Sequence, residues 1–235
     1  MYCKNAFLDF RVEKRNGSEL HFISGENLYD QPFETFVRVG NRYEEKVIRV
    51  SFSPTRKYQI DSVSYDWSQF SSFDYMLEPV EQVEVNTLDA SSPATVYFYP
   101  YKNSARIVEF YMQYGGWGGD ENDLRKLLGD AASQVEIPDI VSGTPGLYGT
   151  KVSFCHHEQR LDAGLDKELK VSKTVEAGKH VRLEVYNGIE QYHVPYKAYL
   201  SNSLTGKKLE ISGTLSSKRP FNYLIIPIAI TDEDK

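Results

Sequence analysis

Cysteine is scarce in this sequence, with Cys3 and Cys155 as the only two among 235 residues. Two cysteines are too few for the disulfide framework of a small secreted domain, and no CxxC pair is present. A single bridge between the two stays open, although we expect both thiols to be free. A chain of this length can bury a core without disulfide or metal staples.

Long apolar runs are also missing. The longest, Leu224–Ile230, contains Pro227 and is far shorter than the roughly 20 residues of a membrane-spanning helix. We therefore expect a soluble protein without a constitutive transmembrane helix. The first residues show neither the apolar core nor the cleavage site of a signal peptide. The compartment stays open between a cytosolic protein and a secreted mature form whose signal was removed before this numbering begins.

The sequence has no excess of positive charge and no catalytic motif. Its 27 basic and 33 acidic residues give a net charge of −6, which opposes attraction to phosphate backbones, so we expect no nucleic-acid binding. The G-x-S-x-G elbow, the P-loop and H-E-x-x-H are all missing. Cys155-His156-His157-Glu158 resembles a metal cluster, but alternate strand residues point to opposite faces. We therefore expect no metal site and no enzymatic activity.

Aromatic residues and a period of two dominate what is present. The chain has 17 Tyr, 12 Phe and 2 Trp, whereas disordered chains carry few aromatics. Apolar and polar residues alternate on both sides of Asn16-Gly17, which is the strongest short-range signal for a β-hairpin. The sequence predicts a mostly β fold. Further strands are expected at residues 46–52, 57–67, 80–85, 94–101, 105–114, 149–157, 167–175, 180–186, 194–200, 207–215 and 223–230.

One segment has helical periodicity. Leu124, Leu127, Leu128 and Ala131 are spaced as one face of a helix, and acidic residues precede them, where negative charge suits a helix N-terminus. The pattern predicts one short surface helix of about ten residues, within 121–130. The stretch 143–149, rich in glycine and proline, is expected to be a loop.

Domain boundaries are weakly marked. A change from irregular aromatic segments to cleaner strands near Pro79 suggests an N-terminal β lobe at 1–79 and a β module at 80–235. A single continuous domain with two lobes fits the sequence equally well.

The region from Leu169 to Lys218 carries a family resemblance. It reads as a strand, a Glu-Ala-Gly turn, a strand, a Val-Pro-Tyr step and an Ile-Ser-Gly-Thr strand. The matching residues are Val175, Ala177, Gly178, Val194, Pro195, Tyr196, Ile211, Ser212, Gly213 and Thr214. In this order of elements the chain resembles the aerolysin-like β-pore-forming superfamily, namely the epsilon-toxin and mosquitocidal-toxin group with its spherulin-type relatives, over residues 80 to 220.

The resemblance implies an elongated fold of long, twisted antiparallel strands with a variable N-terminal lobe. It also implies oligomers on membranes that convert an amphipathic hairpin, usually rich in Ser and Thr, into a β-barrel pore. The corresponding stretch Gly115–Gly149 departs from this pattern, because it holds the charged helical segment and few hydroxyl residues. The alternating segment Ser62–Gln69 could supply a substitute inserting strand, but a half-buried surface strand is the interpretation we favour.

Tyrosines mark a candidate binding surface. In the strand expected at 94–101, Val96 and Phe98 share one face, and the other face carries three tyrosines. Tyrosine offers a large contact area with a polar tip, which suits interfaces and amphipathic pockets. The same residues could instead fill the gap between two lobes. The candidate ligand-binding residues are Tyr65, Trp67, Tyr97, Tyr99, Tyr101, Tyr111, Tyr114 and Trp117.

Three functions fit these observations. The first is a non-enzymatic protein, expected to form a homo-oligomer, that holds a hydrophobic small molecule in an aromatic-lined groove. Its ligand would be a lipid or a pigment such as a carotenoid, and no other cofactor is implied. The alternative is a β-pore-forming toxin or defence protein that oligomerises on membrane surfaces. The second alternative is a structural or storage protein.

Overall fold

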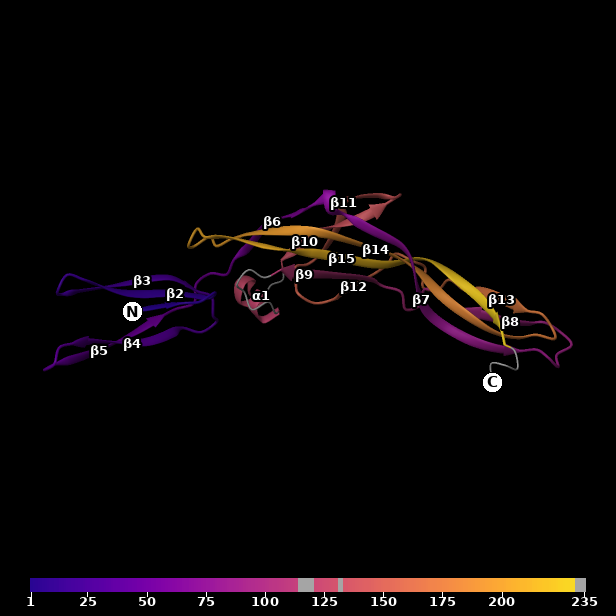
Figure 1. Ribbon diagram of the computed structural model, residues 1–235, viewed down its shortest axis with the longest axis horizontal. Coiled ribbons are helices and arrows are strands. Elements are labelled where there is room, and N and C mark those ends of the chain that lie inside the picture. Colours follow the sequence, from indigo (N-terminus) through magenta and orange to yellow (C-terminus); the bar gives the residue numbers. More distant parts are fainter. Residues whose placement is uncertain (114–120, 131–132, 231–235) are drawn as a thin grey trace. The chain divides into compact units, whose positions relative to one another are not determined.

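The structure is a computed structural model that describes residues 1–113, 121–130 and 133–230. The fold is mostly β, as the sequence predicts, and its sheets are antiparallel (Figure 1). Two strands of 22 residues each, β14 and β15, run side by side. The elements are β1 (Tyr2–Lys4), β2 (Leu8–Arg15), β3 (Glu19–Asn27), β4 (Phe33–Gly40), β5 (Glu45–Phe52), β6 (Gln59–Tyr65), the 3₁₀ turn η1 (Trp67–Gln69), β7 (Ser71–Asn86), β8 (Ala94–Phe98), β9 (Arg106–Gln113), α1 (Glu121–Leu128), β10 (Gln134–Val141), β11 (Thr144–Ser153), β12 (Gln159–Leu161), β13 (Val171–Val175), β14 (His180–Ser201) and β15 (Lys208–Ala229).

The chain divides into two compact units. Unit 1 comprises residues 1–65, 110–157 and 196–214, and unit 2 comprises residues 66–109, 158–195 and 215–235. Each of the strands β9, β14 and β15 therefore contributes residues to both units. The division at residue 79 that the sequence suggests stays a prediction.

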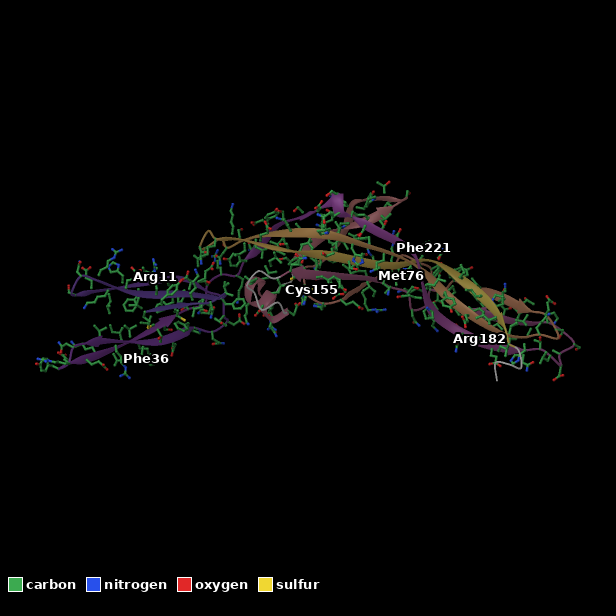
Figure 2. All side chains as sticks on the ribbon, in the orientation of Figure 1. Arg11, Phe36, Met76, Cys155, Arg182 and Phe221 are labelled. Carbon is green, nitrogen blue, oxygen red and sulfur yellow. The ribbon has the colours of Figure 1, made fainter. Side chains whose placement is uncertain are left out.

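Two small sheets begin unit 1. Strands β1, β2 and β3 form one sheet, and β4 pairs with β5 in the other. Asn16 adopts a positive φ of 55° between β2 and β3, which confirms the predicted Asn-Gly hairpin. Apolar side chains of the two sheets form a shared core, while Arg11 and Phe36 lie on their outer faces (Figure 2). The core consists of Phe10, Val12 and Val37, with Leu20, Phe33, Val50 and Phe52 packed against it.

The predicted helix is also present in unit 1. Helix α1 spans Glu121–Leu128 and buries Leu124 and Leu127, two members of the predicted apolar stripe. Gly129 ends it: its φ is +80°, and its N–H donates to the carbonyl of Arg125 at 2.7 Å. Because glycine adopts this left-handed conformation without a Cβ penalty, it suits the position after a helix.

Unit 2 is built on the first part of β14. Strand β7 pairs with β14 from Ser71 opposite His193 to Asn86 opposite His180. The two-stranded sheet of β8 and β13 contributes to the apolar core of this unit. That core consists of Val85, Phe98, Val175, Leu183 and Val185.

A single threonine holds the predicted Glu-Ala-Gly turn of unit 2. The hydroxyl oxygen of Thr87 lies 2.7 Å from the carbonyl oxygen of Glu176 and 2.9 Å from that of Lys179. Its hydrogen is shared between these two acceptors. The backbone N–H of Gly178 donates to the carbonyl of Thr87 at 2.8 Å, and Gly178 has a φ of +75°. The turn between β13 and β14 is thus fixed by a residue that follows β7.

Candidate functional site

The tyrosine face predicted for residues 97–101 is only partly formed. Val96 and Phe98 lie on the core side of β8, and Tyr97 lies on the other side with 56 % of its surface exposed. The ammonium of Lys170 sits 4.0 Å from the centre of the Tyr97 ring, a cation–π geometry. Strand β8 ends at Phe98, so the alternation of faces does not continue beyond it.

Tyr99 and Tyr101 show the effect of that early end. Tyr99 is exposed, whereas Tyr101 is only 7 % exposed. The Tyr101 ring packs edge-on against Tyr223 with 5.7 Å between centroids, and burial raises the pKa of Tyr101. The three tyrosines therefore do not share one exposed face.

The remaining candidate aromatics are spread over both units. Tyr65 of unit 1 is buried, and its hydroxyl donates to the carbonyl of Glu136 at 2.8 Å. Trp67 of unit 2 is exposed and stacks on Phe70 at 6.0 Å. Tyr111 of unit 1 is exposed. Tyr114 and Trp117 lie outside the described residues, and the aromatic groove stays a prediction.

The segment Ser62–Gln69, considered as a substitute inserting strand, is a strand only as far as Tyr65, within β6, and residues 67–69 form η1. It pairs with β14 from Ser62 opposite Tyr199 to Tyr65 opposite Tyr196. Ser62 and Ser64 are exposed, and Tyr65 is buried. This is the half-buried surface strand that the sequence favours.

The β10–β11 hairpin occupies part of the stretch where the family resemblance places an inserting hairpin. Ser142 and Gly143 join its strands with φ values of 51° and 76°, the conformation of a two-residue type I′ turn. Pairing runs from Val141 opposite Thr144 to Gln134 opposite Ser153. The loop predicted for 143–149 is therefore wrong, because Gly143 belongs to the tight turn and residues 144–149 are part of β11.

The base of this hairpin is anchored in the core of unit 1. Val135 and Val152 face each other across the strands, and both are buried. Phe154 follows β11 and packs on the rings of Phe110 and Tyr196, at 4.9 and 5.8 Å between centroids. The hairpin is thus held at the end where its strands begin and finish.

The other end, which we call the hairpin tip (residues 139–149), is exposed and nearly free of charge. Val141, Leu147 and Tyr148 keep 45, 46 and 48 % of their surface accessible to solvent. Asp139 is the only acidic or basic residue from Ile137 to Thr150. Exposed apolar side chains gathered in one segment mark surfaces that contact a partner or a membrane.

Two prolines protect the edges of the hairpin. Residues flanking a two-residue turn form a hydrogen-bonded pair, and the next pair along the ladder directs its N–H groups outward. Pro145 lies opposite Ile140 in that next pair, and Pro138 lies opposite Leu147 in an equivalent one. Since proline has no N–H, each removes a donor that another strand would need to extend the sheet.

The Cys155-His156-His157-Glu158 segment makes ordinary local contacts. The Nε2 of His157 lies 3.6 Å from the Sγ of buried Cys155, and its Nδ1 lies 3.5 Å from an oxygen of Glu121. Burial raises the pKa of the Cys155 thiol, which disfavours the nucleophilic thiolate. Across the described ranges, no group of three or more His, Cys, Asp or Glu could hold a metal ion.

No described helix has the length and apolar character needed to cross a membrane. The only α-helix among the described residues, α1, has eight residues and four charged side chains.

Comparison with known proteins finds no matching family model and no matching curated protein. Among solved structures, the chain is similar to a lamprey immune protein, with 14 % identity, a TM-score of 0.41, and 92 % of this chain and 70 % of that chain covered. It is also similar to the Mpp75Aa1.1 β-pore-forming protein of Brevibacillus laterosporus (8 % identity, TM-score 0.33, coverage 86 and 88 %). A third similar structure is the parasporin-2 toxin of Bacillus thuringiensis, which recognises cancer cells (11 %, 0.33, coverage 72 and 73 %).

Proposed function

We propose that this protein is a non-enzymatic β-pore-forming protein that oligomerises on membranes, and that the tip of the β10–β11 hairpin makes the contact with lipid. The observation that carries the proposal is that Val141, Leu147 and Tyr148 are exposed, on both faces of a tip that has one charged residue. The hydrophobic-ligand hypothesis and the storage hypothesis stay predictions, and the candidate tyrosines line neither of two cavities of unit 2.

The dimensions of the hairpin suit a bilayer. Its strands have 8 and 10 residues, close to the roughly 9–11 residues of a tilted membrane strand. Its two strands pair with each other along their inner edges, and the outward groups would need partners in an oligomer, because an unpaired amide in hydrocarbon costs several kcal/mol. Tyr148, with its apolar ring and polar hydroxyl, has the character of residues that lie at the membrane surface.

One hairpin would bind lipid weakly. Burying the exposed halves of Val141 and Leu147 contributes about 1 kcal/mol for each side chain. Several hairpins in one assembly would act together, because each further contact becomes intramolecular once the first has formed. Oligomerisation is therefore part of the proposal and follows from the small size of the tip.

Dye release from liposomes tests this proposal. A carboxylate on a lipid-facing strand costs up to about 2–4 kcal/mol, so Leu147→Asp should reduce the rate of release by a large factor. The matched control is Leu204→Asp, because Leu204 is 62 % exposed in the turn between β14 and β15. Both variants should keep the β-sheet circular dichroism of the parent protein.

Three outcomes would contradict the proposal. The first is that the parent protein releases no dye from any liposome composition tried, including total lipid extracts. Leu147→Asp could release dye at the parental rate, or Leu204→Asp could lose as much activity as Leu147→Asp. Native mass spectrometry of protein from its natural source covers the competing hypothesis: a stoichiometric adduct of a few hundred daltons would support a bound hydrophobic ligand.

A further inference from the structure

Unit 2 contains a cavity of about 430 Å³, within the size range of small-molecule sites. Residues of β7, β9, β12, β14 and β15 line it, together with the turn that follows β8. The lining residues that matter most are Pro100, Ser104, Asn187, Ile189, Lys218 and Pro220.

The floor of the cavity combines apolar side chains with one unsatisfied polar atom. Pro100, Ile189 and Pro220 are buried. Asn187 is 8 % exposed, and its Nδ2 donates to the Oγ of Ser104 at 3.1 Å. Its Oδ1 is buried and has no hydrogen-bond partner among the described residues. Buried acceptors of this kind are rare in folded proteins, because the lost hydration is not replaced.

The rim of the cavity carries charges that cancel. Lys218 forms an ion pair with Glu78, and Arg160 lies 3.5 Å from Glu158. The four side chains together have no net charge, so a charged ligand gains no net attraction from the rim. It would also lose hydration against the apolar floor. This electrostatic balance favours a neutral ligand.

We propose that this cavity binds a small neutral molecule that combines an apolar body with a hydroxyl or N–H group. The apolar body packs on Pro100, Ile189 and Pro220, and the polar hydrogen is donated to the Oδ1 of Asn187. The proposal does not depend on the proposed function, because every lining residue belongs to unit 2 and the hairpin tip belongs to unit 1.

Three probes of one shape test the donor requirement. Cyclohexanol has the ring and a donor, cyclohexanone has the ring and only an acceptor, and cyclohexylammonium has the ring and a charge. Binding to the full chain is measured by ligand-detected NMR and by the methyl shifts of Ile107 and Ile189, which line the cavity. We expect cyclohexanol to bind about tenfold more tightly than cyclohexanone, which is the value of one hydrogen bond.

Variants locate the effect at Asn187. Asn187→Leu should lower cyclohexanol affinity about tenfold, to the level of cyclohexanone, because it removes the acceptor. The matched control is Asn103→Leu, because Asn103 lines the same cavity with an exposed amide and should leave the affinity unchanged. Ala105→Phe fills the cavity without deleting a polar group and should also lower the affinity. It is the alternative test if Asn187→Leu does not fold.

The proposal is overturned if cyclohexanone binds as tightly as cyclohexanol, or if cyclohexylammonium binds more tightly than either. It also fails if a folded Asn187→Leu or Ala105→Phe variant retains parental affinity. The same conclusion follows if no probe at millimolar concentration shifts the Ile107 and Ile189 methyl signals.

Discussion

Two hairpins of unit 1 share a backbone plan and differ in their side chains. The β4–β5 hairpin turns one face toward β2 and β3 and buries Val37 there. Its other face carries ion pairs, with Arg49 on Glu34 at 2.7 Å and Arg38 near Glu45. The tip of the β10–β11 hairpin carries one charged residue, Asp139, beside the exposed Val141, Leu147 and Tyr148. The contrast teaches that side chains, rather than strand pairing, set which hairpin is suited to water on its outer face.

The largest effect should come from placing the same charge in both hairpins. Val37→Asp leaves an uncompensated charge in a core and should destabilise the protein by about 3–5 kcal/mol. Val141→Asp places it in solvent and should change stability by less than about 0.5 kcal/mol. Urea unfolding followed by circular dichroism measures both. Equal losses would show that the tip is packed rather than exposed.

Giving the tip an ion pair like that of β4–β5 should remove membrane activity and preserve the fold. Val141 and Thr144 lie opposite each other, so Val141→Arg with Thr144→Glu creates a cross-strand pair. Dye release should fall about tenfold or more, because buried charge opposes insertion. Val47→Glu, on the charged face of β4–β5, is the control. If the double variant releases dye at the parental rate, the tip does not make the contact with lipid.

Removing the edge protection of β10–β11 should have a moderate effect. Pro138→Val with Pro145→Val restores two outward N–H groups and makes the hairpin resemble an ordinary edge strand. We expect self-association in solution at a lower protein concentration, as measured by analytical ultracentrifugation. Sedimentation identical to that of the parent would mean that the prolines have no protective role.

The smallest effect concerns pH and arises outside both hairpins, at Tyr58 and Glu26 of unit 1. Burial and a hydrogen bond to Glu26 raise the pKa of Tyr58 well above its usual range. The unfolded chain releases this proton above about pH 10 while the folded chain keeps it, so stability falls as pH rises, by up to about 1.4 kcal/mol per unit. Tyr58→Phe should reduce this slope in urea unfolding. If the dependence of stability on pH is the same in the variant, another titrating group causes it.

Local signals predicted the elements that obey a simple period. Asn16-Gly17 gave the β2–β3 hairpin, and the leucine spacing gave α1. The β10–β11 hairpin was missed because its strands contain Pro138, Pro145, Gly146 and Gly149, which in sequence resemble a loop. Such residues are tolerated here because β10 and β11 form a two-stranded sheet, in which both are edge strands. The only direct signal was Ser142-Gly143, whose turn-forming character is weak without clear alternation around it.

The candidate sites were harder to predict than the fold. Tyr101 does not lie on the expected tyrosine face, because β8 ends at Phe98 and Pro100 follows two residues later. The cavity of unit 2 had no sequence signal, since Ser104 and Asn187 are 83 positions apart and neither belongs to a motif. An unsatisfied amide oxygen becomes visible only when distant strands have been brought together.

The contacts of Thr87 can form only late in the synthesis of the chain. The backbone groups that its hydroxyl contacts are 89 and 92 positions later in the sequence. The turn before β14 therefore cannot form until about 90 further residues have been synthesised. At ribosomal speeds this interval is roughly 5–20 s. During that time β7 has no partner strand to pair with, although it presents Met76, Leu77 and Val80. The glutamates and the proline within β7 would then act as a built-in safeguard for the nascent chain against premature association.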